Sequence, residues 1–113
     1  MHEFALVKGL LETVLEQAEV HGIKKINRVK IVVGEMTAAL PESLQFSFEI
    51  LSQDTPAEGA ELVIENRALQ LECQECKHSF KPKQLKYSCP ECESTLTEII
   101  IGRELFVDYF EGD

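Results

Sequence analysis

Four cysteines carry the most specific chemical pattern in the sequence. They form two pairs, Cys73-x-x-Cys76 and Cys89-x-x-Cys92, separated by twelve residues. A Cys-x-x-Cys turn places two sulfur atoms on the same side of a tight bend, where backbone amides can point at the thiolates. Two such bends on facing hairpins can enclose one zinc ion at Zn–S distances of about 2.3 Å. The spacing therefore predicts a zinc site made of these four cysteines.

Other uses of the cysteines fit the sequence less well. Two structural disulfides are typical of exported chains, and the first residues show no secretory signal. A redox pair requires Cys-x-x-Cys at the start of a helix in a strand–helix–strand frame, and two such pairs in a small β-rich insert do not fit this arrangement. An iron–sulfur cluster remains an alternative occupant. His78, two residues after Cys76, is most simply a solvated side chain, with replacement of a thiolate or a response to pH near the site as alternatives.

Because four thiolates leave no open coordination position, we expect a structural zinc and not a catalytic one. The segment that holds the cysteines is short for a hydrophobic core of its own. Metal binding should therefore supply most of its folding free energy.

Met1-His2-Glu3 offers a second set of donors. The terminal amine of Met1, the imidazole and amide nitrogens of His2 and the amide nitrogen of Glu3 lie within chelating reach along the chain. Nitrogen donors in a plane suit Ni(II) or Cu(II), which can displace amide protons. The alternative is that His2 is a solvated side chain and that Glu3 only favours the start of a helix.

Hydrophobic periodicity predicts an α+β fold, a small mixed three-stranded sheet with two helices plus an inserted zinc-ribbon lobe. We expect residues 61–67 and the strand-rich run after the cysteines to lie side by side, antiparallel, with a bulge at Gly102. The host domain is then 1–67 with 97–113, and the zinc-binding domain is 68–96. The predicted elements are helices at 3–21 and 41–52 and strands at 28–34, 61–67 and 99–109.

Composition narrows the classes of function. The chain has 113 residues, 44% of them apolar, with 11 basic and 20 acidic residues and a net charge of −9. This composition is typical of a globular domain, and an acidic chain binds nucleic acid or anionic lipid poorly. No apolar run approaches the roughly 20 residues that span a bilayer. We expect a cytoplasmic protein without nucleic-acid or membrane partners, and the sequence shows no catalytic triad or nucleotide-binding loop typical of an enzyme.

The two donor sets occur together with further motifs, and the whole sequence resembles the HypA/HybF family of hydrogenase nickel-incorporation proteins. The resemblance covers essentially the full length. Its motifs are Met1-His2-Glu3, Val33-Gly34-Glu35, Pro41-Glu42-x-Leu44-x-Phe46-x-Phe48, Gly59-Ala60-x-Leu62 and the set Cys73, Cys76, Cys89 and Cys92.

The resemblance implies a non-enzymatic nickel metallochaperone. Family members deliver nickel to the large subunit of nickel–iron hydrogenase, in some organisms also to urease, and work with a partner GTPase called HypB. His2 matches their nickel ligand, helped by main-chain nitrogens such as those of Met1 and Glu3, and the four cysteines match those that hold a structural zinc. Some relatives add a distant histidine to the nickel set from the zinc-lobe side. This sequence has only His2, His21 and His78, with none at the end of the zinc lobe. The alternative function is a zinc-ribbon protein-interaction module without a nickel role.

Overall fold

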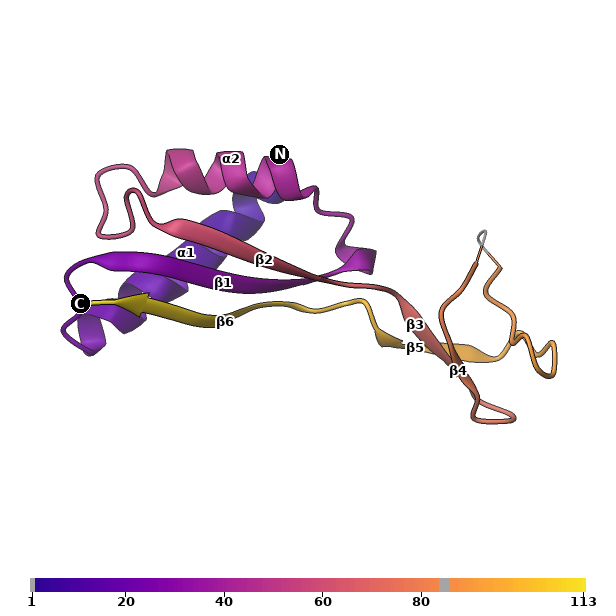
Figure 1. The fold of residues 1–113 in the computed structure, drawn as a ribbon. Helices are drawn as coiled ribbons and strands as arrows, with labels where there is room; N and C mark the ends of the chain where they lie inside the picture. The colour runs from indigo at the N-terminus through magenta and orange to yellow at the C-terminus, as the bar shows by residue number, and fades with distance from the viewer. Residues whose placement is uncertain (1, 84–85) are drawn as a thin grey trace. The chain divides into compact units, whose positions relative to one another are not determined.

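The computed structural model describes residues 2–83 and 86–113, without the side chain of His2 (Figure 1). The predicted α+β class is confirmed, because these residues form two α-helices and two three-stranded sheets. The elements are α1 (His2–Val20), β1 (Ile26–Gly34), the 3-10 turn η1 (Glu35–Thr37), α2 (Pro41–Leu51), β2 (Glu61–Arg67), β3 (Gln70–Cys73), β4 (Ser79–Phe80), β5 (Thr97–Ile101) and β6 (Leu105–Gly112).

The chain divides into two compact units. The first unit comprises residues 1–32, 39–65 and 105–113, and the second comprises residues 33–38 and 66–104. The first unit contains both helices and most of the sheet ordered β2-β1-β6, whereas the second contains the sheet ordered β4-β3-β5 and all four cysteines. The second unit thus reaches beyond the predicted zinc-binding segment and includes the turn that follows β1.

The core of the first unit lies between the helices and one face of its sheet. Helix α1 packs against α2 and β6. Its side chains at three- and four-residue spacing, together with alternate residues of β1, are excluded from solvent, as the periodicity predicted. The buried residues are Val7, Leu11, Val14 and Ala18 from α1, Val29 and Ile31 from β1, Leu44 and Phe48 from α2, and Leu62 from β2.

The opposite face of this sheet carries a row of ion pairs. Arg28 lies 3.0 Å from Glu61 and 3.7 Å from Glu111. Lys30, next on the same face of β1, lies 3.0 Å from Glu65 and 3.3 Å from Asp108. The partners ascend along β2 and descend along β6, so β1 is parallel to β2 and antiparallel to β6, as Figure 1 shows. The predicted mixed sheet is therefore present.

The predicted hairpin between residues 61–67 and 99–109 is wrong for the first sheet. Strand β1 lies between β2 and β6 there. This strand is the most buried of the three, and its last four residues are all buried. Burying a strand on both faces favours the central position, which removes it from the solvent-exposed edge. The expected antiparallel pairing occurs further along the chain, where β3 pairs with β5.

The second sheet explains the glycine that interrupts the last strand-rich run. The pairing of β3 with β5 is irregular between Gln70 and Leu71, which oppose Ile101 and Ile99. This irregularity lies directly before Gly102, whose φ of +134° is open to glycine and strained for other residues. The run therefore forms two strands in two sheets, with the bulge in β5 beside the glycine.

Close backbone packing joins the turn after β1 to the rest of the second unit. Met36 N donates to Gly102 O at 2.7 Å, and Gly34 N donates to Glu104 O at 2.7 Å. A Cβ on Gly34 would lie 2.2 Å from the backbone of Gly102. The carboxylate of Glu35 accepts from Leu69 N at 2.7 Å. The Val33-Gly34-Glu35 motif thus forms hydrogen bonds both to the segment that enters the cysteine-bearing part of the chain, at Leu69, and to the segment that leaves it, at Glu104.

No helix within the described residues combines the length and the apolar composition that spanning a bilayer requires.

We predict that Gly34→Ala destabilises the protein by about 2–3 kcal/mol, because its Cβ overlaps a backbone that cannot move aside cheaply. Gly9→Ala is the matched control: Gly9 lies inside α1 with no atom within 4 Å of the new Cβ, so this change should stabilise by about 1 kcal/mol. Urea denaturation followed by circular dichroism measures both. Equal effects of the two substitutions would contradict the proposed close packing.

Candidate metal centre

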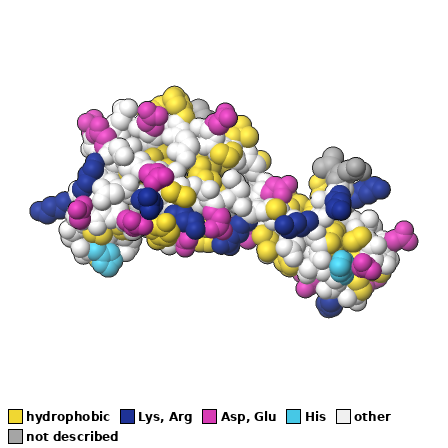
Figure 2. All heavy atoms as spheres, viewed as in Figure 1, with side chains coloured by type: hydrophobic (Ala, Val, Ile, Leu, Met, Phe, Trp, Pro, Cys, Tyr) yellow, Lys and Arg dark blue, Asp and Glu magenta, His cyan; other side chains and the backbone are white. Residues whose placement is uncertain are grey.

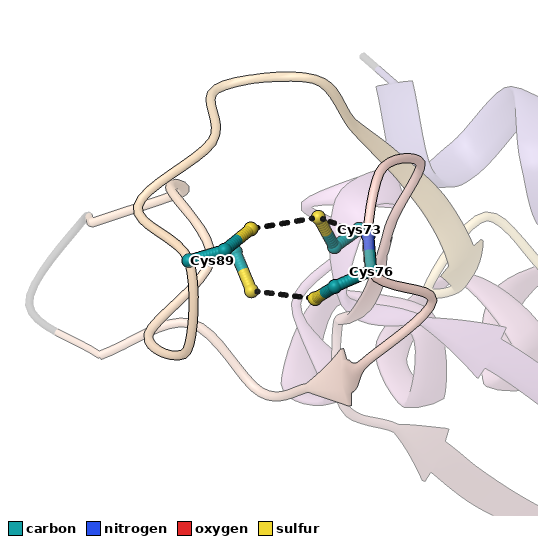
Figure 3. Close-up of side chains that lie close together, drawn as sticks. Cys73, Cys76 and Cys89 are labelled. Carbon is teal, nitrogen blue, oxygen red and sulfur yellow. Dashed lines mark hydrogen bonds between the residues drawn. The ribbon is translucent and has the colours of Figure 1, made fainter.

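The structure brings the four predicted cysteines into one cluster. Their sulfur atoms all lie within 4.8 Å of one another. The Sγ atoms of Cys73 and Cys92 are 3.5 Å apart, and those of Cys76 and Cys89 are 3.6 Å apart. Figure 3 shows the two loops presenting their thiols to each other across the space between them. All four are free cysteines, so the disulfide alternative does not describe this arrangement.

The two cysteine loops share one hydrogen-bond pattern. Lys77 N donates to Cys73 O at 2.9 Å, and Glu93 N donates to Cys89 O at 2.8 Å. The residue after the second cysteine of each pair has a positive φ, 66° at Lys77 and 64° at Glu93. These left-handed residues close each bend and turn the chain back toward the sheet. The two loops are therefore repeated copies of one local structure that faces the same centre.

Backbone amides point at the first sulfur of each loop, as the sequence analysis expected. Cys76 N donates to the Sγ of Cys73 at 3.4 Å, and Glu91 N donates to the Sγ of Cys89 at 3.4 Å. Both of these cysteines are buried, with 0% and 1% of their surfaces exposed, whereas the second cysteine of each pair is exposed. Amide donors stabilise a thiolate that has left bulk water.

The sulfur atoms influence one another's protonation. The pKa of Cys73 is lowered to about 6, chiefly by the backbone hydrogen bond from Cys76. The pKa of Cys92 is raised to about 12: the backbone hydrogen bond from Ser94 lowers it, but the sulfur of Cys73, partial desolvation and the other two sulfurs outweigh that effect. The pKa of Cys76 is also raised. Thiolates this close repel one another, so a bound divalent cation would favour the fully deprotonated set.

The donor set fits zinc. Four sulfurs around an ion at Zn–S distances of about 2.3 Å would lie roughly 3.8 Å apart in a regular tetrahedron. The S–S separations of 3.5 and 3.6 Å in the structure, and the upper limit of 4.8 Å, bracket that value. When bound, zinc would link the two loops through Cys73, Cys76, Cys89 and Cys92.

His78 does not join the four-sulfur cluster in the described part of the chain. Its ring stacks on Phe80, with centroids 6.2 Å apart and planes inclined by 7°. Its Nε2 lies 4.0 Å from a carboxylate oxygen of Glu91, and its side chain is 39% exposed. The backbone oxygen of His78 accepts from Cys73 N at 2.9 Å. His78 therefore supports the first cysteine loop through its main chain, while its ring packs on Phe80.

The second predicted donor set lies at the start of α1. Met1 and the side chain of His2 lie outside the described residues, so their predicted roles as nickel ligands stay predictions. The backbone of His2 begins α1, and Glu3 lies in the first turn. The first four N–H groups of a helix have no acceptor within it. Metal binding by the amide nitrogen of Glu3 would therefore break no hydrogen bond of the helix ladder.

The side chain of Glu3 has a role that sequence reasoning missed. Its Oε2 accepts a hydrogen bond from Leu40 N at 3.3 Å. Leu40 is the residue that precedes α2, and its own side chain provides no cap. The first turn of α1 is thereby joined to the start of α2. An acid at position three is a signal of helix capping, but the helix that it caps lies 37 residues away and could not be inferred from local sequence.

With this geometry in view, comparison with known proteins assigns the family. The family described as hydrogenase/urease nickel incorporation, metallochaperone, HypA, matches residues 1–112. The chain belongs to the HypA family. The predicted resemblance is thus confirmed, and members of the HypA family are metallochaperones and maturation factors rather than enzymes.

Individual HypA relatives cover almost the whole chain. The hydrogenase maturation factor HypA of Dehalococcoides mccartyi is 36% identical and covers 100% of this chain and 95% of its own length. The guanidine hydrolase-activating protein A of Synechocystis sp. is 38% identical, with 98% and 94% covered. The solution structure of the Ni metallochaperone HypA from Helicobacter pylori has 31% identity and a TM-score of 0.69, with 99% and 97% covered.

We predict that Cys76→Ser abolishes stoichiometric zinc binding and loosens the second unit, because three thiolates remain around the ion. His78→Ala is the matched control: it removes a neighbouring side chain outside the cluster and should retain about one zinc per chain. Elemental analysis after dialysis measures the zinc, and amide hydrogen exchange measures the loosening. Loss of zinc in His78→Ala but not in Cys76→Ser would contradict the sulfur assignment.

Zinc affinity should fall as pH falls, with a break near pH 6. Between about pH 6 and neutrality Cys73 is already a thiolate, whereas the raised pKa values of Cys76 and Cys92 keep those thiols protonated until the metal displaces their protons. Below about pH 6 Cys73 must also lose a proton, so the slope of log affinity against pH steepens by one. Competition with a chromophoric chelator across this range measures the slope. A constant slope would contradict the lowered pKa of Cys73.

Proposed function

We propose that this HypA-family chain carries Ni(II) at its N-terminus and delivers it to the large subunit of nickel–iron hydrogenase during maturation. The observation that carries the proposal is the match of the nickel-incorporation family over residues 1–112, which includes both predicted donor sets. A zinc-ribbon interaction module without nickel would account for the cysteines alone. It would leave the whole-chain match and the Met1-His2-Glu3 start unexplained.

In this proposal His2 supplies the imidazole, with the terminal amine of Met1 and the backbone nitrogen of Glu3 as further donors. Such a set is assembled from a few neighbouring residues at the start of α1. Ni(II) favours planar nitrogen donors, whereas the four cysteines offer the soft sulfur set that suits zinc. The donor types therefore separate the cargo from the structural metal.

Release follows from the same chemistry. Nickel held by a chain end can exchange its ligands one at a time with an acceptor, whereas an ion inside four thiolates has no open position. Because the amine, the imidazole and the amides must all lose protons to bind, nickel binding releases protons and weakens as pH falls. A drop in local pH, or an acceptor with stronger donors, would favour transfer.

We further propose that 1–67 with 97–113 acts as the nickel-binding domain and that 68–96 acts as the zinc-binding domain. A HypB-type GTPase is the proposed partner in delivery. The names of the relatives and of the family suggest three recipients. One relative is a hydrogenase maturation factor, another is a guanidine hydrolase-activating protein of similar identity, and the family description includes urease. We favour hydrogenase because most of the relatives compared are named hydrogenase maturation factors.

We predict that His2→Ala abolishes tight Ni(II) binding and leaves zinc content and the helical signal unchanged. His21→Ala is the matched control, since His21 follows the other end of α1 and should keep about one nickel per chain. Equilibrium dialysis on tag-free protein measures nickel, and absorption and circular dichroism report a square-planar nitrogen site. Nickel binding by His2→Ala as tight as that of the parent would overturn the assignment.

Adding three glycines before Met1 tests the terminal amine separately. The extension leaves every side chain in place but moves the amine too far along the chain for a continuous chelate with the imidazole of His2, whereas a single added glycine would create a new chelate of amine, two amides and imidazole. We therefore expect Ni(II) affinity to fall by at least about tenfold. Adding three glycines after Asp113 is the control and should change nothing. Unchanged Ni(II) affinity in the N-terminal extension would exclude the Met1 amine as a ligand. The role of His2 would not be affected, because His2→Ala tests it separately.

A further inference from the structure

Helix α2 carries large apolar side chains on two opposite faces. Leu44 and Phe48 are buried, with 0% and 4% exposed, whereas Phe46 and Ile50 are 59% and 41% exposed. Successive members of this set are two residues apart, so each turns about 200° around the helix from the last. A helix packed on one side normally has a polar outer side. The exposed pair therefore leaves a large apolar surface accessible on the outer side of α2 within the described part of the chain.

The exposed pair belongs to a continuous surface. Phe46 lies four residues from Ile50 and from Glu42 and three residues from Glu49, so these side chains are neighbours on the helix. We call these four residues the α2 outer face. Figure 2 shows apolar atoms exposed along the upper edge over α2, with carboxylate side chains on either side of them. The α2 outer face is thus an apolar centre with an acidic rim.

The charge of the chain is concentrated in the unit that carries this face. The first unit has 13 acidic and 5 basic residues, and the second has 7 and 6, which together give the 20 and 11 of the chain. Residues 39–65, which contain α2, include six acidic residues and no lysine or arginine. A surface that docks here must supply both apolar contact and positive charge.

The α2 outer face also begins beside the proposed nickel donors. Glu3 in the first turn of α1 accepts from Leu40 N at the start of α2, and the two helices pack against each other. Phe46 follows Leu40 by six residues, about 9 Å along the helix axis. A protein seated on this face would therefore reach the start of α1, where incoming donor atoms must contact the metal.

We propose that the α2 outer face is the docking site for the protein with which nickel is exchanged, and that this partner presents an apolar centre rimmed by lysine or arginine. The inference rests on the proposed function. A nucleic acid would be repelled by the acidic rim and would gain nothing from Phe46. A second copy of this chain, paired through the same face, would bring Glu42 and Glu49 against like charges.

The test measures binding of the intact chain to two purified probes, a HypB-type GTPase and the nickel–iron hydrogenase large subunit from the same organism. The variants are Phe46→Ala with Ile50→Ala, and Glu42→Gln with Glu49→Gln. Matched controls are Glu12→Gln with Glu16→Gln, an exposed acidic pair on α1, and Leu96→Ala, an apolar side chain 59% exposed in the second unit. Surface substitutions of this kind should leave folding intact.

We expect the apolar variant to weaken binding of at least one probe by about tenfold or more, through faster dissociation, because truncating a central aromatic removes most of the contact energy. The acidic variant should slow association and reduce its dependence on salt. Both controls should bind like the parent. Nickel affinity should be unchanged in every variant, whereas nickel transfer to the probe should slow in the two α2 variants.

Parent-like binding of both probes by the α2 variants would overturn the proposal, and so would a parent chain that binds neither probe. An equal loss in the control variants would also overturn it, as would a parent dimer that the apolar variant dissociates. These outcomes differ from failure of the proposed function, because that failure appears as absence of nickel on the parent chain in the dialysis measurement.

Discussion

Four sulfur atoms within 4.8 Å of one another are the constraint on which the second unit depends. Thiolates at this separation repel, and few apolar side chains in that unit are buried beside them, chiefly Leu69 and Leu71. Burial of so small a set cannot offset the conformational entropy of the 45 residues in that unit. A divalent cation attracts all four thiolates, which offsets their mutual repulsion and links the two cysteine loops. The unit is therefore organised around a metal more than around a hydrophobic core.

Local patterns made much of this architecture predictable. The cysteine spacing was sufficient to predict the four-sulfur cluster, because the geometry of each Cys-x-x-Cys bend is set by hydrogen bonds within the bend. The structure repeats the same hydrogen bonds in both loops. The left-handed residues Lys77 and Glu93 were not predicted, since neither is a glycine. The signal was nonetheless available: a bend that returns the chain to its sheet needs a positive φ directly after the second cysteine.

Pairings between distant segments were not predictable in the same way. The central place of β1 depends on its pairing with β2 and β6, which come from distant parts of the chain, a relation without any local signature. Gly34 looked like a simple strand end, yet it is required because the backbone of Gly102 lies where a side chain would be. The bond from Glu3 to Leu40 likewise joins residues 37 apart. Sequence periodicity specifies elements and faces, and long-range contacts then decide their order.

The location of the proposed nickel donors raises an electrostatic question that Glu3 helps to answer. The start of a helix carries partial positive charge and should repel a cation. Deprotonated amide nitrogens remove that objection, because Ni(II) bound to two of them forms a neutral unit. The carboxylate of Glu3 adds a negative charge in the same turn while it holds Leu40 N. Glu3 would thus supply a backbone nitrogen to the metal and a negative charge beside it. Its side chain also links the first turn of α1 to the start of α2. Glu3 therefore lies beside the start of α2, the helix whose outer side carries the exposed side chains of Phe46 and Ile50.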